Sequence, residues 1–202
     1  VQRNPNLAKL KNNYLFQRIN SFITSPDMIN LGIGDVTEPL HSIIADEMQK
    51  YASQLSTREG FSGYGPAQGL HKLRKNIVEK LYNNIIDVDE VFISDGAKCD
   101  IARMQMLFGS GKKVAVQDPS YPVYVDDNII AGNEITYLKC TPENDFFAPI
   151  PKDIDLIYFC SPNNPTGAVA TREQLTQVVQ VAKRNNSIII FDTAYAAFIQ
   201  NE

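Results

Sequence analysis

The sequence of 202 residues contains no tryptophan, only two histidines and only three cysteines. Cys99, Cys140 and Cys160 lie far apart and form no CxxC pair, which argues against a disulfide framework and against a zinc site. They are typical of reduced thiols, so we expect a cytoplasmic protein. His41 and His71 fall in predicted helices away from any nucleophile motif. We therefore expect no metal site and no histidine-based nucleophilic catalysis.

The chain also lacks an excess of charge of one sign and any long hydrophobic run. Nineteen Lys and Arg stand against 23 Asp and Glu, which gives a net charge of −4. This balance argues against the strongly basic surface expected of a protein that binds nucleic acid or an anionic membrane. It favours a small polar or anionic metabolite as the ligand. No apolar run approaches the ~18 residues that cross a bilayer, and no signal peptide is evident at the start. We expect a soluble protein with no nucleic-acid partner and no membrane partner.

What the chain does contain is a regular alternation of helical and strand patterns. With 44% hydrophobic residues, it can form a sizeable core. After a polar stretch at 1–35 that resembles an arm, apolar residues recur at helical spacing, and then short apolar runs alternate with further helices. Helices are predicted at 43–55, 70–81, 98–108, 121–131 and 172–185, and strands at 91–94, 114–116, 135–138, 156–160 and 188–191. The alternation predicts an α/β fold with a largely parallel sheet flanked by helices.

Polar motifs follow four of the five predicted strands. Ligands of open parallel sheets bind outside the carboxyl ends of the strands, so we expect these motifs to converge on one rim. They are Asp95-Gly-Ala-Lys98, Asp118-Pro-Ser-Tyr-Pro-Val-Tyr124, Ser161-Pro-Asn-Asn-Pro-Thr-Gly167 and Asp192-Thr-Ala-Tyr195.

The first two motifs each allow a ligand contact and a plain structural role. In Asp95-Gly-Ala-Lys98 a strand gives way to a helix, whose N-terminal amides could bind a phosphate. The alternative is an ordinary turn in which Asp95 is the N-cap. Tyr121 follows a stiff turn at Pro119, from which its ring could stack on a flat ligand. The alternative is a ring that packs on the core.

The last two motifs favour a ligand more strongly. Asn163 and Asn164 offer two adjacent amides within a proline-rich turn, an arrangement that a structural turn rarely needs. Asp192 ends the most apolar strand, where an unpaired carboxylate would be costly, so it needs a partner. A protonated ring nitrogen would suffice, and Tyr195 could add a hydroxyl contact. The alternative is that Asp192 caps a helix that starts at Thr193.

Together, SPNNPTG and the following Asp-x-x-Tyr resemble the fold type I pyridoxal phosphate enzymes of the aspartate aminotransferase superfamily. The runs NYLF, LGIGDVTEPL, GYG-x-x-QG, ISDGAKCDI, QDPSYPVYVD and ENDFF are similar to the LL-diaminopimelate aminotransferases within it. The resemblance implies a homodimer with its active site at the interface and amino-acid and 2-oxo-acid substrates. The implied reaction exchanges an amino group between glutamate/2-oxoglutarate and LL-diaminopimelate/tetrahydrodipicolinate in lysine biosynthesis.

The resemblance also implies roles for individual residues. Pyridoxal 5′-phosphate would be held by its phosphate at the start of a helix, by a stacked ring, by bonds to its phenolic oxygen and by Asp192 at its pyridinium nitrogen. The implied cofactor contacts are Ala97, Lys98, Tyr121, Asn164, Asp192, Tyr195 and, from the neighbouring subunit, Tyr64. The implied substrate contacts are Tyr14, Gly34, Lys98, Tyr121 and Asn164, with Asn163 nearby. Tyr14, like Tyr64, would reach into the active site of the neighbouring subunit.

The resemblance further predicts an N-terminal arm and part of a small domain at 1–40, and a partial cofactor-binding large domain at 41–202. No lysine follows Asp192, so we expect the Schiff-base lysine beyond Glu202 and interpret the chain as the N-terminal part of an enzyme. Ala67 stands where related enzymes carry an acidic residue that recognises the distal amino group of the substrate. An aminotransferase of lysine or another amino acid therefore remains an alternative, as does a truncated module that only binds cofactor or dimerises.

Overall fold

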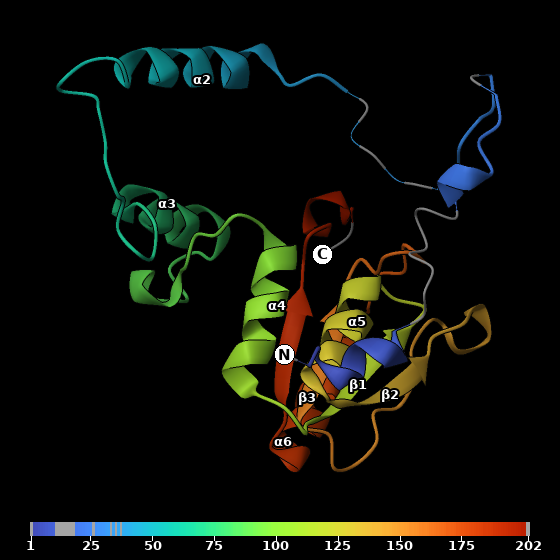
Figure 1. Cartoon of the computed structure of the whole chain (residues 1–202). Coiled ribbons are helices and arrows are strands. Elements are labelled where there is room, and N and C mark those ends of the chain that lie inside the picture. Colours follow the sequence, from blue (N-terminus) through green and yellow to red (C-terminus); the bar gives the residue numbers. More distant parts are fainter. Residues whose placement is uncertain are drawn as a thin grey trace. The chain divides into compact units, whose positions relative to one another are not determined.

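The computed structural model describes residues 2–10, 19–25, 27–32, 34, 36 and 38–200 (Figure 1). Contacts divide the chain into two compact units. The sheet unit comprises Val1–Leu10 and Asp95–Glu202, and the helical unit comprises Lys11–Ser94. The predicted division into an arm at 1–40 and a large domain at 41–202 stays a prediction.

The sheet unit is built on four parallel strands in the order β2-β1-β3-β4. Every residue of the central strand β3 is buried, because helices cover both of its faces. In register, Cys160 at the end of β3 pairs with Asp192 at the end of β4. The sheet confirms the predicted α/β architecture. The strands are β1 (Lys113–Asp118), β2 (Glu134–Lys139), β3 (Leu156–Cys160) and β4 (Ile188–Asp192).

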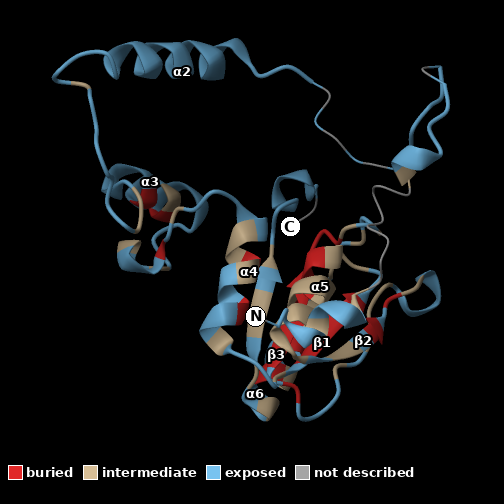
Figure 2. Ribbon diagram, in the orientation of Figure 1, coloured by how far each residue is buried: buried red, intermediate tan, exposed pale blue. Residues whose placement is uncertain are grey.

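Three helices cover this sheet, each close to its predicted range: α4 (Ala97–Phe108), α5 (Pro122–Ala131) and α6 (Arg172–Asn185). Side chains alternate across each strand, so Val114 and Val116 pack with α4 and α5 whereas Ala115 packs with α6 on the other face. The buried residues of Figure 2 accordingly concentrate on the strands and the inner sides of these helices. Short 3-10 helices are η1 (Pro5–Lys9), η3 (Pro142–Asn144) and η4 (Ala196–Phe198).

The helical unit contains α2 (Ser42–Gln54) and α3 (His71–Leu81), which confirms both helices predicted there, and the 3-10 helix η2 (Val88–Glu90). The strand predicted at 91–94 is wrong, since this segment joins no sheet within the described residues. Instead, the Ile93 N–H donates to the Gln68 carbonyl at 2.9 Å. A Cβ added to Gly69 would lie 2.5 Å from the Ile93 Cβ, so only glycine allows this close approach.

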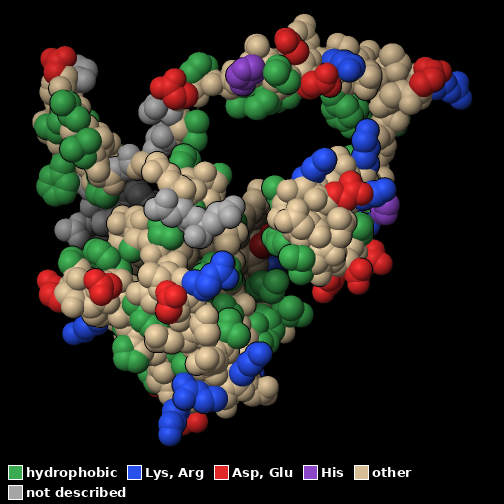
Figure 3. Space-filling view, turned by 180° about the vertical axis from the view of Figure 1, so that it is seen from behind, with side chains coloured by type: hydrophobic (Ala, Val, Ile, Leu, Met, Phe, Trp, Pro, Cys, Tyr) green, Lys and Arg blue, Asp and Glu red, His purple; other side chains and the backbone are tan. Residues whose placement is uncertain are grey.

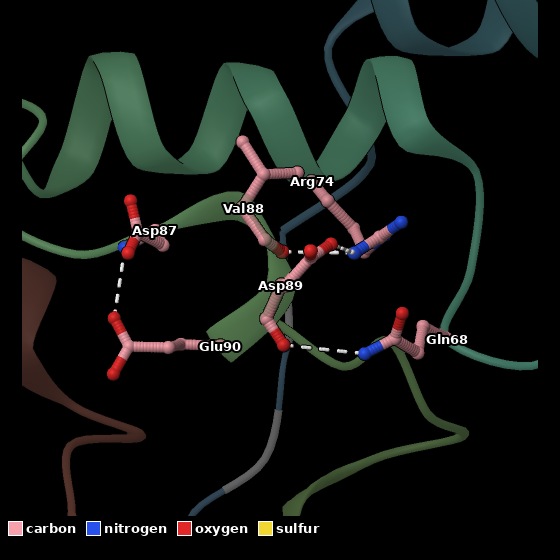
Figure 4. A network of polar contacts seen from close by, with 6 residues as sticks. All are labelled: Gln68, Arg74, Asp87, Val88, Asp89 and Glu90. Atoms are coloured by element: carbon pink, nitrogen blue, oxygen red, sulfur yellow. Dashed lines mark hydrogen bonds and ion pairs between the residues drawn. The ribbon is translucent and has the colours of Figure 1, made fainter.

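A polar network joins α3 to η2 (Figure 4). The buried Arg74 guanidinium donates to the Val88 carbonyl at 2.8 Å and forms an ion pair with Asp89 at 3.5 Å. The Gln68 amide donates to the Asp89 carbonyl at 3.2 Å, and the Glu90 carboxylate accepts from the Asp87 N–H at 2.8 Å. Gln68, one of the residues that carry the family resemblance, therefore has a structural role in this unit.

Helix α2 keeps a row of large apolar side chains exposed. Ile43, Met48 and Tyr51 are 66%, 61% and 52% exposed, and none of the residues of α2 is buried. Figure 3 shows hydrophobic side chains gathered along one side of this helix, with charged ones on the other. Such an amphipathic pattern is typical of a helix that packs against a further surface. Among the described residues, no helix is long and apolar enough to span a membrane.

Candidate functional site

The predicted ligand-binding motifs meet where β1, β3 and β4 end, because parallel strands place their carboxyl ends at the same edge of the sheet. The Ser161 N–H donates to the Asp192 carbonyl at 3.2 Å. The Asn163 side-chain amide donates to the Pro119 carbonyl at 3.1 Å. The Lys98 ammonium lies 5.9 Å from the centroid of the Tyr121 ring. All four motifs therefore contribute to one rim, as predicted.

The start of α4 has the geometry of an anion site. Gly96 is the N-cap, with φ of 131°, and as a glycine it has no side chain with which to cap the helix. A Cβ built on Gly96 would meet no heavy atom of the described residues within 4 Å, so these residues leave the space beside this turn open. The N–H groups of Cys99 and Asp100 donate to the Gly96 carbonyl. The amides of Ala97 and Lys98 precede these bonds, at the end of the helix where the dipole favours negative charge.

The alternative in which Asp95 caps this helix is wrong. The Asp95 carboxylate accepts a hydrogen bond at 2.9 Å from the guanidinium of Arg103, which lies within α4. This hydrogen bond is the main cause that lowers the pKa of Asp95. Asp95 is therefore held as an anion by Arg103, and the N-cap of α4 is Gly96 instead.

Asp192 has the partner that its position demands, and the partner was not foreseen. One carboxylate oxygen accepts from the Tyr124 hydroxyl at 2.6 Å, and the other accepts from the Ala194 N–H at 2.9 Å. The alternative of a helix starting at Thr193 is wrong, since η4 starts at Ala196 with Tyr195 as its N-cap. From sequence, an apolar strand that ends in Asp needs a donor. Tyr124, however, lies on α5, which follows β1, and β3 separates β1 from β4 in the sheet, so strand adjacency does not single it out.

Two buried residues, Tyr124 and Cys160, lie next to Asp192, and each is only 2% exposed to solvent. Burial, followed by the hydrogen bond to Asp192, raises the pKa of Tyr124 far above its ordinary value. Burial also raises the pKa of the Cys160 thiol, which donates to the Pro162 carbonyl at 3.2 Å. Both groups therefore keep their protons at neutral pH, and the Tyr124 hydroxyl acts as the donor to the carboxylate.

The two asparagines of the SPNNPTG turn have different surroundings. Asn163 is 4% exposed and donates to the Pro119 carbonyl and, at 3.0 Å, to the Thr166 hydroxyl, which joins two loops of the rim. Its buried Oδ1 has no hydrogen-bond partner among the described residues. Asn164 donates to the Tyr195 hydroxyl at 3.5 Å, so these two side chains lie together, as a shared ligand would require.

Tyr121 is the N-cap of α5 and lies between the core and the rim. Its ring contacts the Tyr124 ring edge-on, with centroids 6.1 Å apart, and packs partly buried against the core cluster. The packing role considered from sequence is therefore present. The Lys98 ammonium near the same ring shows that Tyr121 also borders the anion site.

The remaining predicted contacts belong to the helical unit. Tyr64 is fully exposed, at 110%, and a Cβ built on the exposed Gly34 would meet nothing within 4 Å. Tyr14 lies outside the described residues. The described residues hold no group of three or more His, Cys, Asp or Glu that could bind a metal ion.

The rim has donors and acceptors that match pyridoxal 5′-phosphate. The helix start at Gly96 suits the phosphate, the Tyr121 ring suits the flat face, and Asp192 suits a protonated ring nitrogen. Asn164 and Tyr195 can together bond a phenolic oxygen. The residues present thus fit the phosphate, the ring face, the ring nitrogen and the phenolic oxygen of this cofactor.

Comparison with known proteins agrees with this reading. The sequence model of the family described as aminotransferase class I and II matches residues 26–202. The chain is 49% identical, over its whole length, to LL-diaminopimelate aminotransferases of Arabidopsis thaliana (chloroplastic) and Protochlamydia amoebophila, of which it covers 49% and 54%. It thus spans about half the length of these curated relatives.

Solved structures show the same relation. L,L-diaminopimelate aminotransferase from Chlamydomonas reinhardtii matches with a TM-score of 0.90 and 51% identity, covering 100% of this chain and 54% of that one. Aspartate aminotransferase from Thermotoga maritima matches with a TM-score of 0.83 at 24% identity, covering 100% of this chain and 56% of that one, which shows the shared fold alone. With the family model matching most of its length, the chain belongs to the class I and II aminotransferases.

Proposed function

We propose that this chain is the cofactor-binding part of a pyridoxal 5′-phosphate-dependent aminotransferase. In this proposal, the enzyme exchanges an amino group between glutamate/2-oxoglutarate and LL-diaminopimelate/tetrahydrodipicolinate in lysine biosynthesis. The observation that carries the proposal is the convergence at one sheet edge of the glycine-capped α4 start, the Tyr121 ring and the Asp192 carboxylate. Relatives at 49% identity that are named LL-diaminopimelate aminotransferase support the choice of substrate.

Each residue of the rim has a separate task in this proposal. The Ala97 and Lys98 amides bind the phosphate, and the Lys98 ammonium adds a positive charge beside it. The Asp192 carboxylate accepts a hydrogen bond from the protonated ring nitrogen. Asn164 and Tyr195 form hydrogen bonds with the phenolic oxygen. When bound, the cofactor supplies an electron sink for the α-carbon of the amino acid. The protein fixes its orientation, so that Asp192 keeps the nitrogen protonated.

The substrate is tested with the full-length protein. Incubated with LL-diaminopimelate and 2-oxoglutarate, it should produce glutamate, followed in a coupled assay. Lysine as the alternative donor is the essential comparison, because Ala67 cannot supply a carboxylate for a distal amino group. Activity with lysine and none with LL-diaminopimelate would overturn the substrate assignment and leave the cofactor assignment standing.

We further propose a homodimer in which Tyr14 and Tyr64 reach the neighbouring active site. The full exposure of Tyr64 and the apolar side of α2 support this proposal. Two variants, Tyr64→Phe and Asp192→Asn, test it by complementation. Mixed after reversible dissociation, the hybrid dimer has one site with both defects and one with neither, so activity should rise above that of either variant alone. No rise on mixing would argue that each site is made from one subunit.

A cytoplasmic location is our proposal for the compartment. Its support is that Cys99, Cys140 and Cys160 are all free thiols, the last two buried. Fractionation of cells that express the full-length protein, probed with an antibody, tests it. Recovery in an organelle or membrane fraction would contradict it.

A further inference from the structure

The contact that the proposed function leaves unexplained is the short hydrogen bond from Tyr124 to Asp192. At 2.6 Å, it is within the range of hydrogen bonds from a hydroxyl to an ionised carboxylate. The Ala194 N–H occupies the other carboxylate oxygen at 2.9 Å. Two donors on separate segments, α5 and the turn after β4, therefore fix the plane of this carboxylate.

Tyr124 itself is held rigidly. Its ring is 2% exposed and lies 5.6 Å, centroid to centroid, from the Tyr158 ring in the core. Its backbone carbonyl accepts from the buried Asn128 side chain at 2.7 Å. Core packing of the ring and the Asn128 bond to its backbone thus hold Tyr124 in place, and its hydroxyl bonds the Asp192 carboxylate from this position.

The spacing along α5 links two parts of the site. Tyr121, the N-cap, and Tyr124 are three residues apart, which places them on the same face of the first turn. Their rings are in edge-on contact at 6.1 Å. The start of α5 therefore positions two groups of the site. One is the Tyr121 ring, which can stack on a flat ligand, and the other is the Tyr124 hydroxyl, which orients the Asp192 carboxylate.

We propose that Tyr124 is a positioning residue: its hydroxyl holds the Asp192 carboxylate in the orientation that meets the cofactor ring nitrogen. This inference rests on the proposed function, which assigns Asp192 to that nitrogen. Tyr124 touches neither substrate nor cofactor in this scheme and acts through Asp192.

The test replaces Tyr124 with phenylalanine in the full-length protein and measures the dissociation constant of pyridoxal 5′-phosphate with the apoprotein. Loss of a hydrogen bond to a charged group should weaken cofactor binding about tenfold. The kcat should fall with the KM for the amino donor unchanged, since Tyr124 does not contact substrate. Tyr158→Phe is the matched control. It removes a hydroxyl from the same core cluster, and that hydroxyl has no hydrogen-bond partner within the described residues.

A double-mutant cycle with Asp192→Asn separates this inference from the proposed function. If Tyr124 acts through Asp192, Tyr124→Phe should change cofactor affinity by less than about twofold in the Asp192→Asn background. Additive losses would overturn the positioning role. The positioning role would also be overturned if Tyr124→Phe left cofactor affinity and kcat unchanged while Asp192→Asn lowered them, and this outcome would leave the proposed function intact. A harmless Asp192→Asn would instead overturn the assignment of Asp192 to the ring nitrogen.

Discussion

Replacing Gly96 with alanine tests whether the start of α4 binds the cofactor phosphate. Gly96 has φ of 131° and ψ of 157°, a backbone region open essentially to glycine alone. An added Cβ would meet no atom within 4 Å, so the cost is conformational and amounts to about 1–3 kcal/mol. To escape this strain, the turn must rotate, which moves the amides of Ala97 and Lys98.

Gly109→Ala is the matched control at the other end of the same helix. Gly109 has φ of 77° and ψ of −166°, in the same region of backbone space, and its added Cβ also meets nothing within 4 Å. Both variants should lower the free energy of unfolding by about 1–3 kcal/mol. Only Gly96→Ala should weaken pyridoxal 5′-phosphate binding, by about tenfold or more, because charge-assisted bonds to the phosphate are lost.

The assay is equilibrium binding to the full-length apoprotein, with denaturant unfolding of the same samples. Pyridoxal, which lacks the phosphate, should bind wild type and Gly96→Ala equally, and this comparison isolates the phosphate contribution. Binding of pyridoxal 5′-phosphate to Gly96→Ala as tight as to wild type would refute a phosphate site at the start of α4. An equal loss of binding in Gly109→Ala would refute it as well.

Three further substitutions test the packing, each by denaturant unfolding of the full-length protein. Gly69→Ala should cost about 3 kcal/mol or more, since φ of 96° adds strain to a 2.5 Å clash with Ile93; a smaller loss than for Gly96→Ala would contradict this. Thr171→Ala should cost about 0.5–2 kcal/mol by removing the cap that accepts from the Gln174 N–H; no change would deny the cap any role. Arg74→Ala should cost about 1.5–3 kcal/mol by removing its bond to η2; an unaltered midpoint would make the network of Figure 4 dispensable.

The strands of the sheet unit could be predicted because periodicity and burial agree there. β3 at 156–160 is continuously apolar and buried on both faces, and α6 at 172–185 has a strong amphipathic pattern with a capping box. The run at 91–94 is similar in composition, but an apolar β-branched run does not specify a pairing partner. Its Ile93 N–H bonds to the loop carbonyl of Gln68 instead.

The site could be located from sequence, but its internal bonding could not. Strand ends followed by polar motifs predict a common rim, because that follows from parallel topology alone. Which donor pairs with Asp192 depends on the tilt of α5 over the sheet, which no local pattern encodes. The same holds for Asp95, which sits one residue before the N-cap but turns to Arg103 within α4.

The most direct measurement is a crystal structure of the full-length protein with pyridoxal 5′-phosphate. The phosphate should lie on the amides of Ala97 and Lys98, the ring on Tyr121, and the ring nitrogen against Asp192 with the Tyr124 hydrogen bond intact. A cofactor bound elsewhere, or one whose ring nitrogen faces away from Asp192, would contradict the account.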